Sequence, residues 1–121
     1  MIIIIGTCGA LGAVARYEFD TFIKDRIRTA IPVGILVINV IGSLILGVFV
    51  GLNLRHGLSN DIELAAGTGF CGGFTTFSSL MYEGTQLART GVYRQAIKIL
   101  SLNMVLGGLA ATVGLAVTGA L

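Results

Sequence analysis

The sequence has few charged residues, a single histidine and only two cysteines. Lysine, arginine, aspartate and glutamate make up 12% of its 121 residues, about half the share of a typical soluble domain. His56, the only histidine, is interpreted as a solvated loop residue with no paired nucleophile, so we do not expect an enzyme. Because the net charge is only +2 and the basic residues do not cluster with aromatic ones, nucleic-acid binding has little support.

The cysteine pattern offers no metal site. Cys8 and Cys71 both lie in apolar runs, where cysteine usually acts as a small packing residue. The sequence has no CxxC pair and no His/Cys cluster with the spacing of metal ligands. The apolar N-terminal stretch lacks the basic region that begins a signal peptide, so we interpret it as part of a helix that stays in the mature protein.

Apolar residues make up 55% of the chain and fall into four long runs. A transmembrane helix needs about 20 mostly apolar residues, and short connections between helices place neighbours antiparallel. The sequence therefore predicts an all-α membrane protein, with residues 1–121 forming one domain. The four predicted transmembrane helices cover residues of about 2–23, 33–54, 62–89 and 92–121.

Basic residues are distributed unevenly between the two ends of the predicted bundle. Four spans place both termini on one side, with the loop between the second and third spans. That side carries only Arg55. The other side carries Arg16, Lys24, Arg26, Arg28, Arg89, Arg94 and Lys98. The positive-inside rule then predicts a single orientation with both termini outside the cytoplasm.

Small and polar residues repeat at four-residue spacing along three of the predicted helices. The repeats are Cys8, Gly12 and Arg16; Asn39, Ser43, Gly47 and Gly51; and Asn103, Gly107 and Ala111. Small residues let membrane helices approach closely, so the glycines are interpreted as packing contacts. The two asparagine amides need polar partners in hydrocarbon, and either an interhelical hydrogen bond or the lining of a pathway would supply them.

The third predicted helix is interrupted by glycines and hydroxyl residues at 72–79, Gly-Gly-Phe-Thr-Thr-Phe-Ser-Ser. This composition disfavours a continuous helix, and broken backbone at membrane depth is tolerated only where protein, water or an ion satisfies it. Such breaks recur at ion and substrate sites. The alternative is a continuous helix with a glycine-packed face and serines bonded back to i−4 carbonyls.

These motifs make the sequence similar to the Fluc (CrcB-type) fluoride channels over nearly the whole chain. The resemblance rests most of all on Gly-Gly-x-Thr-Thr-Phe-Ser at 72–78, followed by Glu83. It also rests on Gly12-xxx-Arg16-Tyr17 and on Asn39-xx-Gly42. It implies a channel subunit for passive fluoride efflux, spanning the bacterial plasma (inner) membrane several times and assembling as an antiparallel dimer with a second Fluc-type subunit.

The resemblance also implies roles for particular residues. Gly72 and Thr75 would offer backbone carbonyls to a structural Na⁺ ion at the dimer centre. Phe77 would turn its ring edge, which is partly positive, toward fluoride. Asn39 would line the pathway and Arg16 would attract anions. The residues available as donors along the pathway are Thr76, Ser78, Ser79, Asn39 and Asn103.

The sequence departs from the family pattern at four positions. Leu80 stands where the family usually has a second pore phenylalanine, and Met81 where a serine usually follows. Gly107 and Ala111 occupy positions where the family tends to carry Ser or Thr. Together with the strong charge bias, these departures favour one half of a heterodimer, although a homodimer stays open.

Two other functions compete with the channel interpretation. A small multidrug exporter is also a four-helix dimer, but it needs a carboxylate in the middle of the membrane. Glu18 and Glu83 both lie away from the middle of their predicted helices. A subunit with only an assembly role would not need the break in the third helix.

Overall fold

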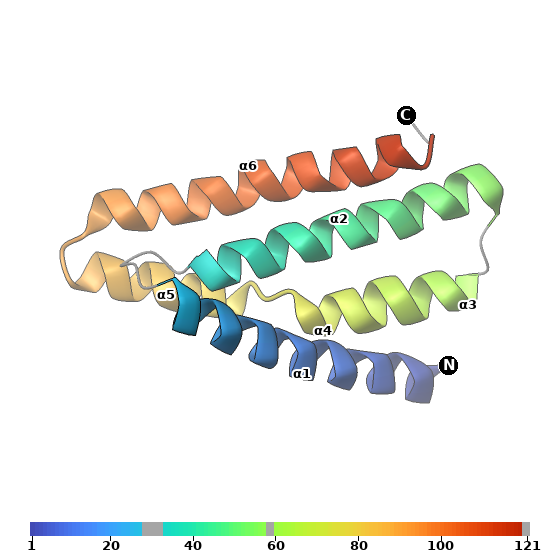
Figure 1. The fold of residues 1–121 in the computed structure, drawn as a ribbon, viewed down its shortest axis with the longest axis horizontal. Coiled ribbons are helices and arrows are strands. Elements are labelled where there is room, and N and C mark those ends of the chain that lie inside the picture. Colours follow the sequence, from blue (N-terminus) through green and yellow to red (C-terminus); the bar gives the residue numbers. More distant parts are fainter. Residues whose placement is uncertain (28–32, 58–59, 120–121) are drawn as a thin grey trace.

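Residues 1–27, 33–57 and 60–119 are described by a computed structural model, in which long helices run side by side and no strand occurs among these residues (Figure 1). Three helices are continuous: α1 (Ile2–Arg26), α2 (Val33–His56) and α6 (Tyr93–Val117). All three are long and apolar enough to cross a membrane. The prediction of an all-α membrane protein is thereby confirmed.

The third predicted helix is divided into shorter pieces, as the break in the sequence predicted. It begins with α3 (Asn60–Glu63) and the π-helix η1 (Leu64–Cys71), continues as α4 (Gly72–Phe74), and resumes as α5 (Ser78–Arg89). Residues 75–77 between α4 and α5 are not helical. No piece is long enough to count alone as a spanning helix, although together they run the length of the bundle (Figure 1).

Two helix ends differ from the sequence-based boundaries by three residues or more, and the others by at most two. α1 continues to Arg26, whose guanidinium carbon lies 4.6 Å from the ring centroid of Phe22, a cation–π contact within its last turns. α6 ends at Val117 and not at the end of the chain, because Gly119 has a φ of +79°, a conformation that terminates helices. Arg28 and residues 120–121, included in the predictions, lie outside the described residues.

The glycine stripes lie where helices cross closely, as predicted. A Cβ at Gly12 of α1 would collide with the Phe70 carbonyl, and one at Gly73 would collide with the Gly9 carbonyl. Likewise a Cβ at Gly47 of α2 would collide with the backbone of Ala111 in α6. Because glycine lacks that Cβ, backbones approach here without a hydrophobic drive from the lipid.

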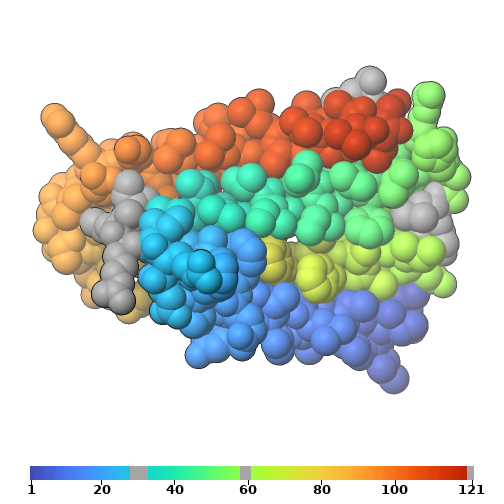
Figure 2. Space-filling model, viewed as in Figure 1, coloured from blue at the N-terminus to red at the C-terminus, as the bar shows by residue number. Residues whose placement is uncertain are grey.

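Both termini lie at the same end of the bundle, together with the end of α2 and the start of α3 (Figure 1). The turn between α5 and α6 lies at the opposite end. In the space-filling view, the yellow segment around the break is visible between α1, in blue, and α2, in cyan to green (Figure 2). Neighbouring helices therefore cover the break on some sides and leave it uncovered on another.

Candidate functional site

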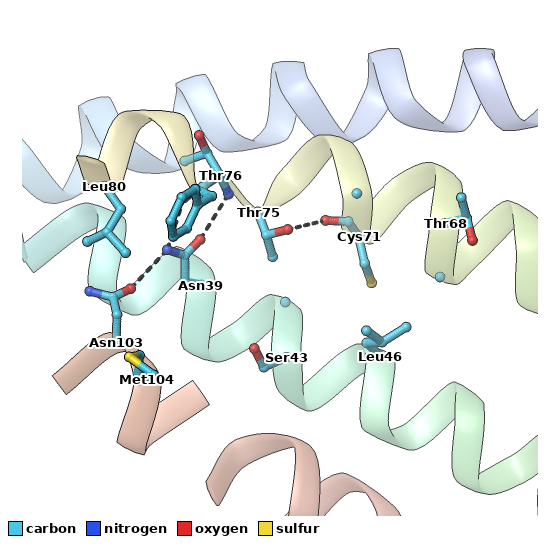
Figure 3. A pocket seen from close by; sticks show the side chains of 14 residues that line it. Asn39, Ser43, Leu46, Thr68, Cys71, Thr75, Thr76, Leu80, Asn103 and Met104 are labelled. Atoms are coloured by element: carbon cyan, nitrogen blue, oxygen red, sulfur yellow. Dashed lines mark hydrogen bonds between the residues drawn. The ribbon is translucent and has the colours of Figure 1, made fainter. Parts of the chain in front are cut away.

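Asn39 of α2 supplies the hydrogen bonds that the broken helix lacks. Its Oδ1 accepts the Thr76 N–H at 3.0 Å, and its Nδ2 donates to the Thr76 carbonyl at 3.2 Å. The same Nδ2 donates to Asn103 Oδ1 of α6 at 2.9 Å (Figure 3). Asn103 Nδ2 in turn donates to the Ile99 carbonyl at 2.9 Å. The two asparagines thus make an interhelical hydrogen bond, one of the two roles that the sequence left open.

Hydroxyl groups organise the two helix ends that flank the break. Thr75 Oγ1 donates to the Cys71 carbonyl at 2.8 Å, while Thr76 Oγ1 accepts the Ser79 N–H at 3.1 Å. The second bond is a capping interaction, since it satisfies an N–H in the first turn of α5. Thr76 Oγ1 also lies 3.3 Å from Ser78 Oγ. Thr76, although buried, therefore has hydrogen bonds for its N–H, its carbonyl and its hydroxyl.

The break occupies residues 75–77, inside the predicted segment 72–79, and the glycine pair before it stays helical. Gly72 has helical angles, φ −62° and ψ −39°, and the chain leaves the helix only at Thr75, where ψ is 160°. In a continuous helix the Thr76 N–H would bond to the Gly72 carbonyl, but here it donates to Asn39. The Gly72 carbonyl consequently loses the partner that it would have in a continuous helix.

A groove of about 560 Å³ runs beside the break, open on one side of the protein. Residues of α2 face those of η1 and α4 across it, and Asn103 and Met104 of α6 close one end (Figure 3). The Phe77 side chain, 72% exposed, lies at its edge. Its lining includes Asn39, Gly42, Ser43, Leu46, Gly67, Thr68, Cys71, Gly72, Thr75, Thr76, Phe77, Leu80, Asn103 and Met104.

A second cavity of about 400 Å³, here called the side hollow, lies between α1, α2 and α5. Predicted site residues gather in it, since Arg16 from α1 and Ser78 and Ser79 from α5 all line its wall. The other lining residues are Tyr17, Asp20, Lys24, Ile35, Ile38, Thr76, Tyr82 and Glu83. Thr76 lines the groove as well, so the break forms the partition between the two spaces.

The structure places the residues that depart from the family pattern inside the bundle. Leu80 is 5% exposed and forms a buried cluster with Ile35 and Ile99, against which Met81 packs. A Cβ at Gly107 would lie 3.4 Å from Ser43 Oγ. Leu80 thus belongs to the packing of this chain as well as to the groove wall.

Sequence reasoning did not identify the ion pair of Asp20 and Lys24, although a signal for it was present. Arg16, Asp20 and Lys24 are spaced by four residues and so share one face of a helix. Lys24 Nζ lies 3.1 Å from Asp20 Oδ2, and both residues line the side hollow. Gly42, identified as part of a motif, has a structural role as well, because a Cβ there would collide with the Thr75 methyl group.

One helix of this membrane bundle is broken, and polar groups at the break line a groove. Broken helices recur at ion and substrate sites, so these features indicate a small membrane transport protein. The chain belongs to the CrcB-like protein family, Camphor Resistance (CrcB), whose model matches residues 3–115. Because its relatives are bacterial and its helices can span a bilayer, it is a multi-pass plasma membrane protein.

Curated relatives match most of the chain. It is 46% identical over 110 residues to fluoride-specific ion channel FluC 2 of Cutibacterium acnes, covering 89% of each chain. It is 40% identical over 116 residues to FluC 1 of Symbiobacterium thermophilum, covering 94% of each. It is 36% identical over 119 residues to FluC of Azobacteroides pseudotrichonymphae, covering 97% of this chain and 94% of the relative. Since these relatives are channels, the expectation that the chain is not an enzyme is confirmed.

Proposed function

We propose that this chain is a subunit of a fluoride-selective channel that lets cytoplasmic fluoride leave the cell passively, and so reduces fluoride toxicity. The observation that carries this proposal is the Thr75–Phe77 break, where Thr76 separates the groove from the side hollow. The relatives named as fluoride-specific channels support the choice of ion. Fluoride is small and strongly hydrated, so a selective path must replace its water with donors.

The residues around the break suit an anion path. Ser78 is exposed and lines the side hollow, as does Arg16, so that a hydroxyl and a guanidinium are available there to replace water of hydration. The exposed ring of Phe77 can present its partly positive edge to an anion. Thr76, Ser79, Asn39 and Asn103 are proposed as lining groups whose hydrogen bonds hold the path in shape.

A structural Na⁺ ion held by the backbone of the break is the second part of the proposal. The Gly72 carbonyl has lost its helical partner, and a Cβ at Gly72 would meet nothing within 4 Å, which leaves room beside it. The carbonyls of Gly72 and Thr75 would supply hard oxygen ligands. Among the described residues no group of three His, Cys, Asp or Glu could hold a metal, so such an ion would depend on carbonyls.

The third part of the proposal is that the channel contains another subunit besides this chain. Phe77 and Met104, 72% and 79% exposed, lie beside polar groups along an open groove, and an antiparallel Fluc-type partner would close it. A homodimer and a heterodimer both remain candidates. The charge bias, Leu80 and Met81 favour the heterodimer, as do relatives with numbered names, such as FluC 2 of Cutibacterium acnes and FluC 1 of Leifsonia xyli.

Fluoride efflux from proteoliposomes tests the proposal. Vesicles loaded with potassium fluoride would contain either this chain alone or this chain co-purified with a second Fluc-type subunit, and an electrode would follow release after valinomycin is added. We expect fluoride but not chloride release from the pair. Full activity of the chain alone would refute the heterodimer, and no fluoride release from either preparation would refute the channel.

Phe77→Ile should reduce that efflux to the background of empty vesicles, because an aliphatic side chain has no positive ring edge. Phe22→Ile is the matched control, since Phe22 is also exposed but lines neither the groove nor the side hollow. Unchanged flux in Phe77→Ile would remove the role proposed for this ring.

A further inference from the structure

The charges of the side hollow cancel one another among the described residues. Arg16 and Lys24 contribute two positive charges, and Asp20 and Glu83 contribute two negative ones. A hollow that gathers anions would be expected to keep an excess of positive charge, because a charged cleft raises the local concentration of oppositely charged ions. The acidic residues therefore need an explanation.

Asp20 is placed to neutralise Lys24. Its Oδ2 lies 3.1 Å from Lys24 Nζ, whose side chain is 61% exposed, while Asp20 itself is only 23% exposed. Asp20 Oδ1 is buried and has no hydrogen-bond partner among the described residues. Gly34 of α2 leaves the space that Asp20 Oδ1 occupies, because a Cβ at residue 34 would collide with that oxygen.

Stability does not explain this arrangement. An ion pair with an exposed lysine adds little to folding stability, and a buried carboxylate oxygen without a hydrogen bond is unfavourable. The effect that remains is electrostatic, because paired opposite charges largely cancel at the distance of an approaching ion.

We propose that Asp20 limits the attraction of anions into the side hollow by holding Lys24 in an ion pair, so that among the described residues Arg16 is the unpaired cation of the hollow. Asp20 is thus a residue that sets how strongly the hollow concentrates anions. This inference rests on the proposed function, in which the side hollow is the anion's approach to the break.

A cysteine probe measures the potential of the hollow without requiring transport. Tyr82 is 62% exposed and lines the hollow from α5, so Tyr82→Cys in a Cys8→Ala/Cys71→Ala background gives one accessible thiol there. An anionic and a cationic methanethiosulfonate would react with it in nanodiscs, and the ratio of their rate constants reports the sign and size of the local potential.

Asp20→Asn should raise the anionic-to-cationic ratio about threefold to tenfold at low salt, the change expected from removing one charge several ångströms away. The increase should collapse in about 1 M salt, where screening acts within about 3 Å. Adding Lys24→Gln to Asp20→Asn should return the ratio to near its starting value, because the net charge of the hollow is restored.

Asp25→Asn is the matched control. Asp25 is exposed on the same helix and carries the same charge, but it does not line the hollow. An unchanged ratio in Asp20→Asn, or an equal increase in Asp25→Asn, would overturn the proposal.

Fluoride efflux from the same Asp20 variant, with the native tyrosine and cysteines, separates the two proposals. If the ratio rises and no preparation releases fluoride, the channel proposal fails while the role of Asp20 in setting the potential stands. If fluoride is released normally and the ratio does not move, only the role of Asp20 fails. Support for both requires a higher ratio and faster initial efflux at low salt.

Discussion

At the scale of single residues, Asn39 replaces the backbone partners that Thr76 would have in a continuous helix. One amide side chain accepts the Thr76 N–H and donates to both the Thr76 carbonyl and Asn103 Oδ1. These bonds lie among membrane-spanning helices, where water is scarce and an unpaired polar group is expensive. Asn39 therefore determines the shape of the break as well as lining the groove.

Asn39→Ala should lower the free energy of unfolding by roughly 3 kcal/mol, because it leaves the Thr76 N–H and carbonyl and Asn103 Oδ1 without a partner, at a cost of about 1–3 kcal/mol for each buried group. Thermal unfolding in detergent, followed by circular dichroism, would measure the loss. Ser43→Ala is the control, since Ser43 lies one turn along α2 and lines the same groove. Equal stability of the two variants would contradict the bridging role of Asn39.

At the scale of elements, α1 packs closely against the pieces on the N-terminal side of the break. Gly12 lies against the carbonyl of Phe70, and Gly73 lies against the carbonyl of Gly9. Phe74 packs edge-on to Phe19 of α1, with ring centroids 6.2 Å apart. This contact holds α4 in place up to the residue before the chain leaves the helix.

Gly12→Ala should destabilise the protein by about 1–3 kcal/mol, as overpacking of a tight interface does, because the new Cβ would lie against the Phe70 carbonyl and 2.8 Å from the Phe74 nitrogen. Gly6→Ala is the matched change on the same helix, where a Cβ would meet nothing within 4 Å. We expect it to leave the melting temperature unchanged or slightly raised, since alanine favours helix. A similar loss in both variants would show that α1 does not depend on the contact at Gly12.

At the scale of the whole molecule, the two ends of the bundle differ in charge. Exposed Arg89 and Arg94 lie around the turn from α5 to α6, and Lys24 and Arg26 lie at the nearby end of α1. The opposite end holds both termini (Figure 1). Positively charged segments are retained in the cytoplasm, so the orientation proposed for this chain places the α5–α6 turn inside the cell.

Labelling of intact cells tests that orientation. In the Cys8→Ala/Cys71→Ala background, His56→Cys at the end of α2 should react with an impermeant maleimide from outside. Thr90→Cys, in the α5–α6 turn, should react only after lysis, because the membrane separates it from the reagent. Both positions are exposed, so burial does not confound the comparison. Equal labelling of both in intact cells would indicate dual topology and would favour a homodimer.

The sequence predicted many of the residues that form the site, but fewer of the contacts between them. The four-residue spacing of small residues correctly indicated that Gly12 and Gly47 are packing contacts, because helical spacing determines which residues share a face. It did not indicate that α2 packs against α6. The break was correctly assigned to the third helix from its glycines and threonines. The helical conformation of the glycine pair inside the predicted segment was not predicted, because propensity shows where a helix is weak but not where its hydrogen bonds find other partners.

By itself, the sequence determined that this is a membrane protein with four helical stretches and a polar interruption in the third, because hydropathy and helix propensity are properties of short segments. Only the tertiary structure decided that Gly72 stays helical, that Asn39 satisfies Thr76 from 37 residues away, and that Thr76 separates the groove from the side hollow. The physical reason is that a broken backbone in a membrane takes its hydrogen bonds from whichever helix packs beside it.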